Sequence, residues 1–481
     1  MRPAAPRLRV LHAIHDFLPR HRAGSEIYAF ELCRELGRRH HVTVLAAEFD
    51  PVRPHGHVTW RVQDGLPVVE VVNNWIAGSV ADTYRPPLIT EQLAALLDVV
   101  QPDVIHVHSL LNLSFDLPAL AHARGIPVAA TLHDYTLVCP SGGQRVHRAE
   151  EHVCETIDPA RCARCFPESP VYAHIGVGTF TGASGLGPSV TRAAAFLKRR
   201  SPRLARGLAS AARRSVGITV LASDIVERLQ RARELFDQID LVVAPSRSIA
   251  DEFARLGMSR SKVRVLDYGF VPFPRVSRRG GNGDGPLRIG FIGTLVWHKG
   301  VHVLVDAVRG LAGDAYELKI FGSPDVFPDY AADLRRRSSG LPVSFMGEFD
   351  RSGAAEAYAQ LDVLVVPSLW PENSPLVIHE AYMAGVPVVG ARMGGIVELV
   401  DDGLNGLLYD PRSAPELTRV LQGLIDDRPR LDAFARMLPP VTSMEAHARE
   451  WEAMYAELIG RSSLDRQPET DEKQVKRIAD P

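Results

Sequence analysis

Two nearly identical phrases, DLVVAPS (Asp240–Ser246) and DVLVVPS (Asp362–Ser368), describe a short apolar strand that ends in a Pro-Ser turn. Uninterrupted runs of β-branched and apolar residues are typical of strands that are covered on both faces of a parallel sheet. Ligands of such sheets bind beyond the carboxyl ends of the strands, so both phrases are expected to open toward one cleft between two domains. The alternative is that unrelated strand ends merely look alike.

Similar runs alternate with helix-length segments on both sides of a glycine-rich stretch. The runs of the first half are residues 7–14, 41–47, 103–109, 127–134 and 262–269, and those of the second half are residues 287–293, 316–322, 342–347 and 387–392. Strands that alternate with helices indicate βαβ units. The sequence therefore predicts an α/β protein with two doubly wound, Rossmann-like domains.

Domain boundaries follow from this pattern. We predict an N-terminal domain over residues 1–275 with an insertion at about 138–215, a linker over 276–286, where four glycines crowd into a polar stretch, and a C-terminal domain over 287–444. An amphipathic helix over 445–461, with Trp451 on its apolar face, is expected to pack back onto the N-terminal domain. Residues 462–481 are polar and charged, which is typical of a disordered tail.

Length and charge exclude several classes of protein. The 481 residues, 46% of them hydrophobic, suffice for two cores, and the net charge of −2 gives no overall field that would attract nucleic acid. No apolar run approaches the ~18 residues of a membrane-spanning helix, and the first residues have too short an apolar core for a signal peptide. A cytoplasmic location is therefore expected.

The stretch WPENSPLVIHEAYMAGVPVVGARMGG (Trp370–Gly395) holds the first chemical signal. Ser374 suits an N-cap, Pro375 the first helical position and Gly385 the end, so a helix is predicted over residues 375–384. Glu372 then lies in the loop before this helix, and Glu380 lies on its second turn. Two arbitrary glutamates are more often solvated surface acids than ligand-binding groups.

A second signal is GFIGTLVWHKG (Gly290–Gly300). Gly293 follows a strand and Lys299 lies near the start of the next helix, so that backbone amides and one cation can meet an anionic group. A lone glycine loop is weak evidence, because such glycines are often present for the turn alone.

Taken together, these stretches resemble the retaining glycosyltransferases of family 4, which have the GT-B architecture. The resemblance covers most of the chain, from residues 24–45 through TLHDYTLVCP (Thr131–Pro140) and residues 293–300 to residues 371–410. Its most specific part is the Glu-x7-Glu spacing of Glu372 and Glu380, followed by a strand and the Gly394-Gly395 turn.

The resemblance implies a role for each matching residue. Glu380 would accept hydrogen bonds from the ribose of a nucleotide sugar, and Glu372 and His133 would contact the donor sugar. Lys299, the amides of Leu376 and Val377, and the loop at Gly293 and Thr294 would hold the diphosphate, and Gly24 would let the backbone approach it. Catalysis is thereby expected from Glu372, His133 and Lys299.

The chain departs from the family pattern at two places. Thr294 stands where many members have an arginine, which leaves open whether Arg392 or Arg22 supplies the second cation. The run Asn373–Leu376 replaces the glycine-aromatic-glycine run of many relatives, but it keeps the free amides of the helix.

The resemblance implies transfer of a sugar from a nucleotide-diphosphate sugar, UDP rather than GDP, to a glycan or lipid-linked acceptor. The acceptor would attack the same face of the sugar while the leaving phosphate assists its deprotonation, without a metal. A catalytically silent partner subunit and a nucleotide-sugar epimerase are the alternatives. The first would tend to lose Glu380 and Lys299 together, and both are present.

Four cysteines, Cys139, Cys154, Cys162 and Cys165, crowd into the insertion and end in a Cys-x-x-Cys pattern. In a cytoplasmic chain this pattern indicates a structural zinc site, although the first two spacings are unusual. An iron–sulfur cluster and unligated thiols are the alternatives, and His147 and His152 are spare ligand candidates. Cys33, alone in an apolar helix, is expected in the core.

The insertion also carries a basic segment. Eight Lys or Arg residues and no acid lie between Arg192 and Arg214, interleaved with apolar residues. Such a segment can lie on an anionic membrane surface, which would place the protein at the inner face of the membrane, or it can be a solvated basic face.

Overall fold

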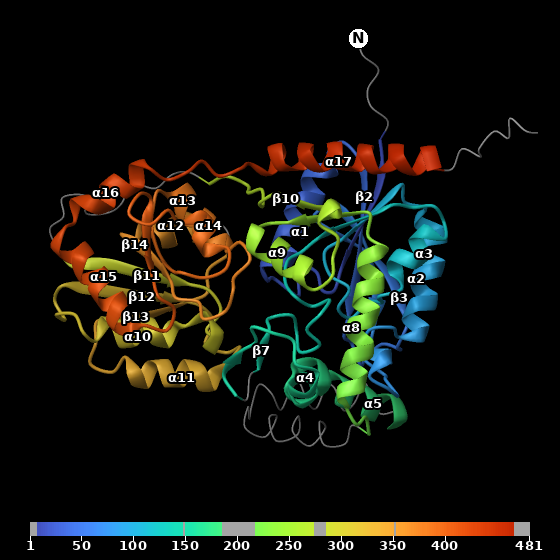
Figure 1. Cartoon of the computed structure of the whole chain (residues 1–481), viewed down its shortest axis with the longest axis horizontal. Coiled ribbons are helices and arrows are strands. Elements are labelled where there is room, and N and C mark those ends of the chain that lie inside the picture. Colours follow the sequence, from blue (N-terminus) through green and yellow to red (C-terminus); the bar gives the residue numbers. More distant parts are fainter. Residues whose placement is uncertain (1–6, 148–149, 185–216, 274–284, 351–352, 466–481) are drawn as a thin grey trace, which may run out of the picture.

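The computed structural model describes residues 7–147, 150–184, 217–273, 285–350 and 353–465. Figure 1 shows two layered α/β halves side by side, the first coloured blue to green and the second yellow to orange. The predicted fold class, two Rossmann-like domains, is confirmed. The basic segment Arg192–Arg214, the predicted linker up to residue 284 and the tail beyond residue 465 lie outside the described residues.

The first half is built on an eight-stranded sheet. Its order is β10-β9-β6-β5-β1-β2-β4-β3, and the strands are parallel except for the β3–β4 pair. The strands are β1 (Arg9–Ile14), β2 (His41–Glu48), β3 (Val58–Gln63), β4 (Leu66–Val72), β5 (Val104–Val107), β6 (Val128–Thr131), β9 (Leu241–Ala244) and β10 (Val263–Val265). The chain leaves β1 toward β2 on one side, and β5 lies on the other side, so the direction of winding reverses between β1 and β5.

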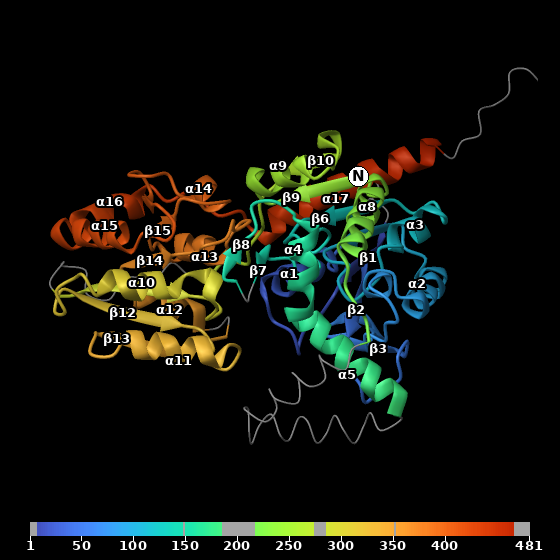
Figure 2. The same cartoon turned by 60° about the horizontal axis from the view of Figure 1, so that its bottom comes forward.

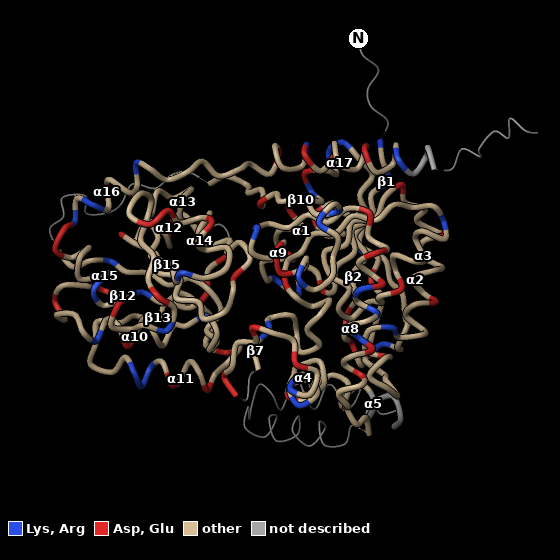
Figure 3. The backbone as a smooth tube through the Cα atoms, viewed as in Figure 1, with Lys and Arg blue, Asp and Glu red and all other residues tan. Residues whose placement is uncertain are grey.

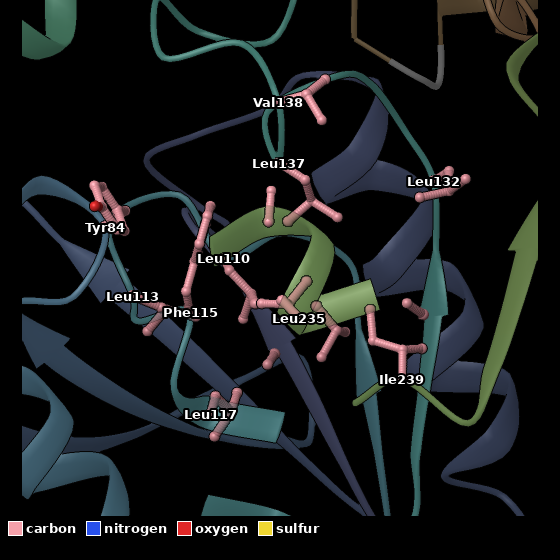
Figure 4. Packing of buried hydrophobic residues seen from close by; sticks show 14 of the residues in the cluster. Tyr84, Leu110, Leu113, Phe115, Leu117, Leu132, Leu137, Val138, Leu235 and Ile239 are labelled. Carbon is pink, nitrogen blue, oxygen red and sulfur yellow. The ribbon is translucent and has the colours of Figure 1, made fainter. Parts of the chain in front are cut away.

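Helices cover both faces of this sheet. They are α1 (Gly24–Leu36), η1 (Ala81–Thr83), α2 (Pro87–Val100), α3 (Leu117–His122), α8 (Ala222–Asp237), α9 (Arg247–Arg255) and η3 (Arg260–Lys262). Figure 4 shows part of the core on one face, and Leu235 of α8, Ile239 just after it, Leu137 and Val138 all belong to this buried cluster. The segment that leads to Cys139 is therefore part of this core.

The insertion follows β6 and consists of short elements. These are β7 (Val146–His147), β8 (His152–Val153), α4 (Pro159–Cys165), η2 (Phe166–Glu168) and α5 (Pro170–Ser184). Asp158 is the N-cap residue of α4, and its carboxylate accepts hydrogen bonds from two first-turn amides. In Figure 1, α17 (Met444–Asp465) runs along the top of the first half and α4 and α5 lie at its bottom, and in Figure 2 α5 again lies at the bottom, away from α17.

The second half is built on a six-stranded parallel sheet of order β13-β12-β11-β14-β15-β16. Its strands are β11 (Leu287–Ile292), β12 (Tyr316–Phe321), β13 (Val343–Gly347), β14 (Val363–Val366), β15 (Val388–Ala391) and β16 (Gly406–Tyr409). Its helices are η4 (Trp297–Lys299), α10 (Val301–Val308), α11 (Pro328–Arg337), α12 (Ala354–Ala359), α13 (Leu376–Ala384), α14 (Ile396–Leu399), α15 (Ala414–Asp426) and α16 (Pro429–Arg436). The direction of winding reverses between β11 and β14.

The C-terminal helix α17 crosses back and packs on α1 and β5 of the first half. Trp451 is fully buried there, and its indole nitrogen donates a hydrogen bond to the Tyr28 hydroxyl at 3.1 Å. Residues before the helix pair with the end of the first half, where the Phe270 amide donates to Thr442 O at 2.9 Å. The helix runs to Asp465, which is four residues beyond its predicted end at residue 461, so the predicted start of the tail at residue 462 is wrong.

Charged residues of both signs are interspersed over the described chain, as Figure 3 shows. This distribution agrees with the small net charge, and the charges that matter for function are therefore local ones.

Candidate functional site

The carboxyl ends of β11 and β14, where the second sheet reverses its winding, carry most of the predicted site residues. Gly293 and Thr294 follow β11, and Lys299 closes the short helix η4. Ser368 and Glu372 follow β14. A reversal of winding opens a crevice between two neighbouring strand ends, which is where ligands of such sheets bind.

Lys299 and Glu372 contact each other directly. The Lys299 ammonium donates to Glu372 Oε1 at 2.6 Å, and the Ser368 hydroxyl donates to the same oxygen at 2.6 Å. The ammonium also lies 5.5 Å from the centre of the Trp370 ring, where the π electrons attract a cation. The Glu372 side chain is only 7% exposed and that of Lys299 is 28% exposed, so solvent screens this pair little. Each side chain therefore holds the other in place.

The Gly394-Gly395 turn explains why the Glu372 loop can adopt its path. The Gly395 amide donates to Glu372 O at 2.7 Å. A Cβ atom added at Gly395 would lie 1.5 Å from Asn373 O, and one added at Gly394 would lie 2.4 Å from Glu372 O. No side chain fits in either place, so the two glycines let the turn support the loop backbone.

Helix α13 begins at Leu376 rather than at Pro375, and Pro375 rather than Ser374 is its N-cap residue. The predicted cap was wrong because the Ser374 hydroxyl has other partners, Asp267 Oδ1 at 2.7 Å and His379 Nε2 at 2.9 Å. The amides of Leu376 and Val377 lie in the first turn of this helix, where N–H groups have no acceptor within the helix.

Gly24 begins α1 and lies directly opposite the start of α13. A Cβ atom added at Gly24 would be 3.1 Å from Cδ1 of Leu376. Within the described residues no side chain caps either helix, whose N-cap residues are Ala23 and Pro375. Two helix N-termini, one from each half, therefore lie close together, and each brings the amides of its first turn and the positive end of its dipole to this place.

Glu380 lies on the second turn of α13. Its Oε2 oxygen accepts a hydrogen bond from the Tyr358 hydroxyl at 2.9 Å. Burial, and then the charge of Glu380, raise the pKa of Tyr358 well above its usual value, so the phenol remains a donor. Tyr358 of α12 thus orients the carboxylate.

Gly293 and Thr294 line a small cavity of about 160 Å³ at the ends of β11, β12 and β13. Its wall is completed by backbone and aromatic groups, including Phe321, Gly322 and Phe349. Ser323 and Glu348 also line this cavity, so it combines aromatic rings with polar groups, as a pocket for a flat polar ring requires.

The two serines that end the repeated phrases both contact the Glu372 loop. Ser246 at the end of β9 donates to Asn373 Oδ1 at 2.9 Å, and Ser368 at the end of β14 donates to Glu372. Asn373 continues across the interface, because its amide nitrogen donates to Leu132 O at 2.6 Å. The two phrases therefore open toward the same place, as the sequence predicts.

Glu398 of α14 makes a further contact between the halves. Its carboxylate accepts hydrogen bonds from the backbone amides of Arg247 at 2.8 Å and Ser248 at 2.7 Å, at the start of α9. A carboxylate at a helix N-terminus is favoured by both the free amides and the dipole.

His133 follows β6 at this interface, but both of its ring nitrogens are engaged within the first half. Its Nε2 lies 3.1 Å from His108 Nδ1, and its Nδ1 lies 2.9 Å from the Tyr268 hydroxyl. Its backbone oxygen lies 3.4 Å from the Asn373 amide nitrogen. The role predicted for the His133 side chain, contact with a donor sugar, would require one of the ring hydrogen bonds to break.

Comparison with known proteins places this site in a family. A profile described as "Glycosyltransferase Family 4" matches residues 22–162, and one described as "Glycosyl transferases group 1" matches residues 286–427. A GDP-mannose-dependent alpha-mannosyltransferase of Mycolicibacterium smegmatis is 33% identical over 235 residues, which are 47% of this chain and 58% of that protein. The chain belongs to the family 4 glycosyltransferases.

Other relatives of this family 4 glycosyltransferase match over similar lengths. The sulfoquinovosyl transferase SQD2 of Arabidopsis thaliana is 29% identical over 210 residues, which are 41% of this chain and 40% of that protein. The chain thus spans about half the length of these curated relatives.

Solved structures share the fold over nearly the whole chain. The Anabaena protein HepE, crystallised with UDP and glucose, has a TM-score of 0.57 at 17% identity and covers 95% of this chain and 100% of its own. The sucrose-phosphate synthase of Thermosynechococcus elongatus has a TM-score of 0.60 at 17% identity and covers 94% of this chain and 99% of its own.

The two arginines considered as substitutes at the Thr294 position have different surroundings in this family 4 glycosyltransferase. Arg392 donates to Asp402 Oδ2 at 2.9 Å and is thereby held at the end of β15. Arg22 lies two residues before Gly24, is exposed, and has no ion pair among the described residues. Arg22 thus lies beside the uncapped start of α1, whereas Arg392 is engaged in an ion pair.

The four cysteines of the insertion gather in one region, with Cys162 and Cys165 one turn apart on α4. Burial, and then the charges of Cys139, Cys154 and Cys165, raise the pKa of the Cys162 thiol to about 12. Among the described residues, two groups of three ligand atoms lie within 4.8 Å of one another, and neither contains a cysteine. Sulfurs around zinc are about 3.8 Å apart, so the side chains would have to move inward to bind it.

None of the helices in the described ranges combines the length and the hydropathy that a membrane crossing requires.

Several residues that build this site are absent from the sequence-based prediction. They are Ser368, which holds Glu372, Tyr358, which holds Glu380, and Asn373 and Glu398, which join the halves. Ser368 ends a phrase that the sequence repeats, and this repeat is the one signal that could have pointed to it.

Proposed function

We propose that this chain moves a sugar from a nucleotide-diphosphate sugar to an acceptor hydroxyl, with retention of the anomeric configuration and without a metal in the transfer step. The observation that carries this proposal is the meeting of two uncapped helix N-termini, at Gly24 and Leu376, together with the contact of Lys299 with Glu372 on the loop that leads into the second of these helices. Free amides, two dipoles and one ammonium together attract a compact anion such as a diphosphate.

The donor's parts match the surrounding groups. The diphosphate would lie against the amides of Leu376 and Val377 and near Lys299. The ribose hydroxyls would donate to Glu380, whose second oxygen is already oriented by Tyr358. The base would enter the cavity that Gly293 and Thr294 line, so this loop would contact the base rather than the diphosphate that the resemblance assigns to it. In this arrangement the sugar lies next to Glu372.

The reaction needs stabilisation of a leaving diphosphate. The bond between the anomeric carbon and the phosphate oxygen breaks, and its electron pair goes to that oxygen. Lys299 and the oriented amides stabilise the new charge because they are fixed before the reaction begins. The acceptor oxygen bonds to the anomeric carbon on the same face, and its proton passes to the leaving phosphate.

In this scheme Glu372 contacts the donor sugar and does not take up the proton of the acceptor hydroxyl. Its charge is paired with Lys299 in the absence of a ligand, and a carboxylate held beside the sugar ring can also accept a hydrogen bond from a sugar hydroxyl.

The donor is proposed to be a UDP-sugar and the acceptor a glycan or a lipid-linked glycan. The structural relative HepE was crystallised with UDP, whereas the mannosyltransferase relative is described as GDP-mannose-dependent. The test below therefore compares nucleotides with different bases. Arg22 is proposed to act on the diphosphate as the second cation.

Calorimetry and turnover together test the proposal. Titration with UDP, GDP and ADP should give tight binding for one of them without added metal. Incubation with the matching nucleotide sugars and membrane or glycan extracts should give a glycosylated product only when an acceptor is present. Product without an acceptor would indicate an epimerase, and binding without any turnover would indicate a silent partner subunit.

A further inference from the structure

Three histidines and a tyrosine form one chain of hydrogen bonds beside the interface. His12 of β1 contacts His108 (Nδ1 to Nε2, 2.9 Å), His108 contacts His133 (Nδ1 to Nε2, 3.1 Å), and His133 contacts Tyr268 (Nδ1 to hydroxyl, 2.9 Å). Neighbouring rings in the chain are stacked. The chain starts inside the first sheet and ends at the interface.

All three imidazoles are uncharged at neutral pH. Burial lowers the pKa of His12 and of His133 to about 3, and burial together with the other histidines lowers the pKa of His108 well below its usual value. A neutral imidazole has one donor nitrogen and one acceptor nitrogen. If every hydrogen bond of this series is made, all of them must therefore be donated in the same direction, so only two arrangements of the protons are possible.

In the first arrangement Tyr268 donates to His133, which donates to His108, which donates to His12. Every ring is then protonated on Nε2. The Nε2 atom of His12 is buried and has no partner among the described residues, so this arrangement leaves one N–H unpaired.

In the second arrangement the direction is reversed and every ring is protonated on Nδ1. Tyr268 then accepts from His133, and its own hydroxyl proton finds no acceptor among the described residues. The nitrogen of His12 also stays unpaired. Two unpaired buried groups cost more than one, so the first arrangement is favoured.

The direction in which these hydrogen bonds are donated affects Asn373 of the second half. Its amide nitrogen lies 2.6 Å from Leu132 O, which identifies this atom as the nitrogen, and its second N–H is shared between His133 O at 3.4 Å and the Tyr268 oxygen at 3.5 Å. In the first arrangement the Tyr268 proton points to His133, and an oxygen lone pair is left for the Asn373 amide. In the second arrangement the Tyr268 oxygen accepts from His133, and its own proton takes a position around the oxygen that the Asn373 amide would otherwise use.

We propose that His12 and His108 are positioning residues, which fix which nitrogen of His133 carries its proton and thereby the direction of the Tyr268 hydroxyl. The Tyr268 oxygen is then able to accept a hydrogen bond from the Asn373 amide. This hydrogen bond holds the neighbouring Glu372 loop in its working position. The effect on turnover rests on the proposed glycosyl transfer, whereas the protonation pattern can be read without it.

The protonation pattern is measured directly by nitrogen NMR of the histidine rings. Protein labelled with ¹⁵N in the imidazoles gives distinct long-range correlation patterns for rings protonated on Nε2 and on Nδ1. The signals are assigned from their loss in His12→Phe, His108→Phe and His133→Phe. We expect Nε2–H for all three rings at neutral pH. Nδ1–H in His108 or His133 would overturn the proposal.

Two matched Tyr→Phe variants test the link to Glu372. Tyr268→Phe removes the hydroxyl at the end of the chain. Tyr455→Phe removes a buried hydroxyl of α17 that lies 2.7 Å from Nδ1 of His106, a histidine that is not part of this series of hydrogen bonds. We expect kcat to fall about tenfold in Tyr268→Phe and less than twofold in Tyr455→Phe, with nucleotide affinity unchanged in both. Equal effects on kcat would overturn the proposal.

The double variant tests whether His108 acts through Tyr268. His108→Phe should lower kcat about as much as Tyr268→Phe, and the two changes together should cost no more than either alone. Additive effects would overturn the proposal. A wild-type protein that binds nucleotide but transfers no sugar would contradict the proposed function instead, and the ring spectra would still decide the protonation pattern.

Discussion

The ammonium of Lys299 lies 2.6 Å from the Oε1 oxygen of Glu372, although 73 residues separate them in the sequence. The pair joins the ends of β11 and β14, the two strands between which the second sheet reverses its winding. The resemblance assigns Lys299 to the diphosphate and Glu372 to the sugar. These two parts of a donor are adjacent, so a contact between the two residues fits both assignments and orients the residues before a ligand binds.

The two glutamates should differ in what their loss changes. Glu380→Gln should weaken nucleotide binding about tenfold, because a charged acceptor for the ribose is lost, whereas Glu372→Gln should mainly lower kcat, by about 100-fold. Calorimetry with the nucleotide and steady-state kinetics separate the two effects. Glu450→Gln, at an exposed glutamate of α17, is the control and should change neither. The same mild loss from both variants would contradict the assignment.

Loss of Lys299 should affect stability as well as function. Lys299→Ala leaves the Glu372 carboxylate buried without its cation, which should lower the free energy of unfolding by about 2 kcal/mol, and it should reduce both nucleotide affinity and kcat.

The double variant Lys299→Met with Glu372→Gln separates these effects. It removes both charges, so it should recover most of the stability in thermal unfolding while remaining inactive. Wild-type kinetics in Lys299→Ala, or a double variant as unstable as the single one, would argue against this account.

The buried histidines should make the protein sensitive to mild acid. Burial lowers the pKa of His447 to about 4 and that of His12 to about 3, whereas an unfolded histidine titrates near 6.5. Below pH 6.5 the unfolded chain binds protons that the folded chain does not. The stability is therefore complete above pH 6.5 and falls on acidification, by about 1.4 kcal/mol per pH unit for each such histidine.

A single substitution checks the sign and size of this effect. Denaturant unfolding between pH 7 and 4.5 should give a shallower slope of unfolding free energy against pH for His447→Gln than for the wild type. His57→Gln, at an exposed histidine, should leave the slope unchanged. A slope of the opposite sign would mean that the buried rings are charged.

The cysteines of the insertion should hold one structural zinc ion. Four thiolates close a tetrahedral site and leave no position for a reacting water, and metal binding would order a segment with few apolar residues. Elemental analysis of protein purified without added metal should find about one zinc per chain. The content should fall in Cys162→Ser with Cys165→Ser, and not in Cys33→Ala, whose thiol is buried against α17 in another core.

Activity should decline with the loss of this zinc, and magnesium or manganese should not restore it. Stoichiometric iron in place of zinc would show that the cysteines hold an iron–sulfur cluster. Four freely alkylated thiols and no bound metal would rule out both.

Local patterns predict most strands, and the exceptions have physical reasons. The hairpin of β3 and β4 is absent from the prediction, although Asp64 and Gly65, which both have positive φ, form the turn that an Asp-Gly pair favours. Strand β16 is also absent, because four residues between two polar turns carry too short a pattern.

The site was predictable only in part. Glu380 and Glu372 are placed by the boundaries of one helix, which is a local property. The contacts of Lys299 with Glu372 and of Asn373 with Leu132 depend on the order of the strands and on how the halves meet. No local pattern contains that information, and only the repeated Pro-Ser phrase pointed to the meeting place.

The most direct test of the central claim follows the anomeric carbon during turnover. Proton NMR of a reaction with an α-linked nucleotide sugar and a suitable acceptor, in metal-free buffer, should show an α-linked product that appears together with free nucleoside diphosphate. The α-linked donor should persist when the acceptor is omitted. A β-linked product, a strict requirement for a divalent metal, or conversion of the donor sugar without an acceptor would contradict the account.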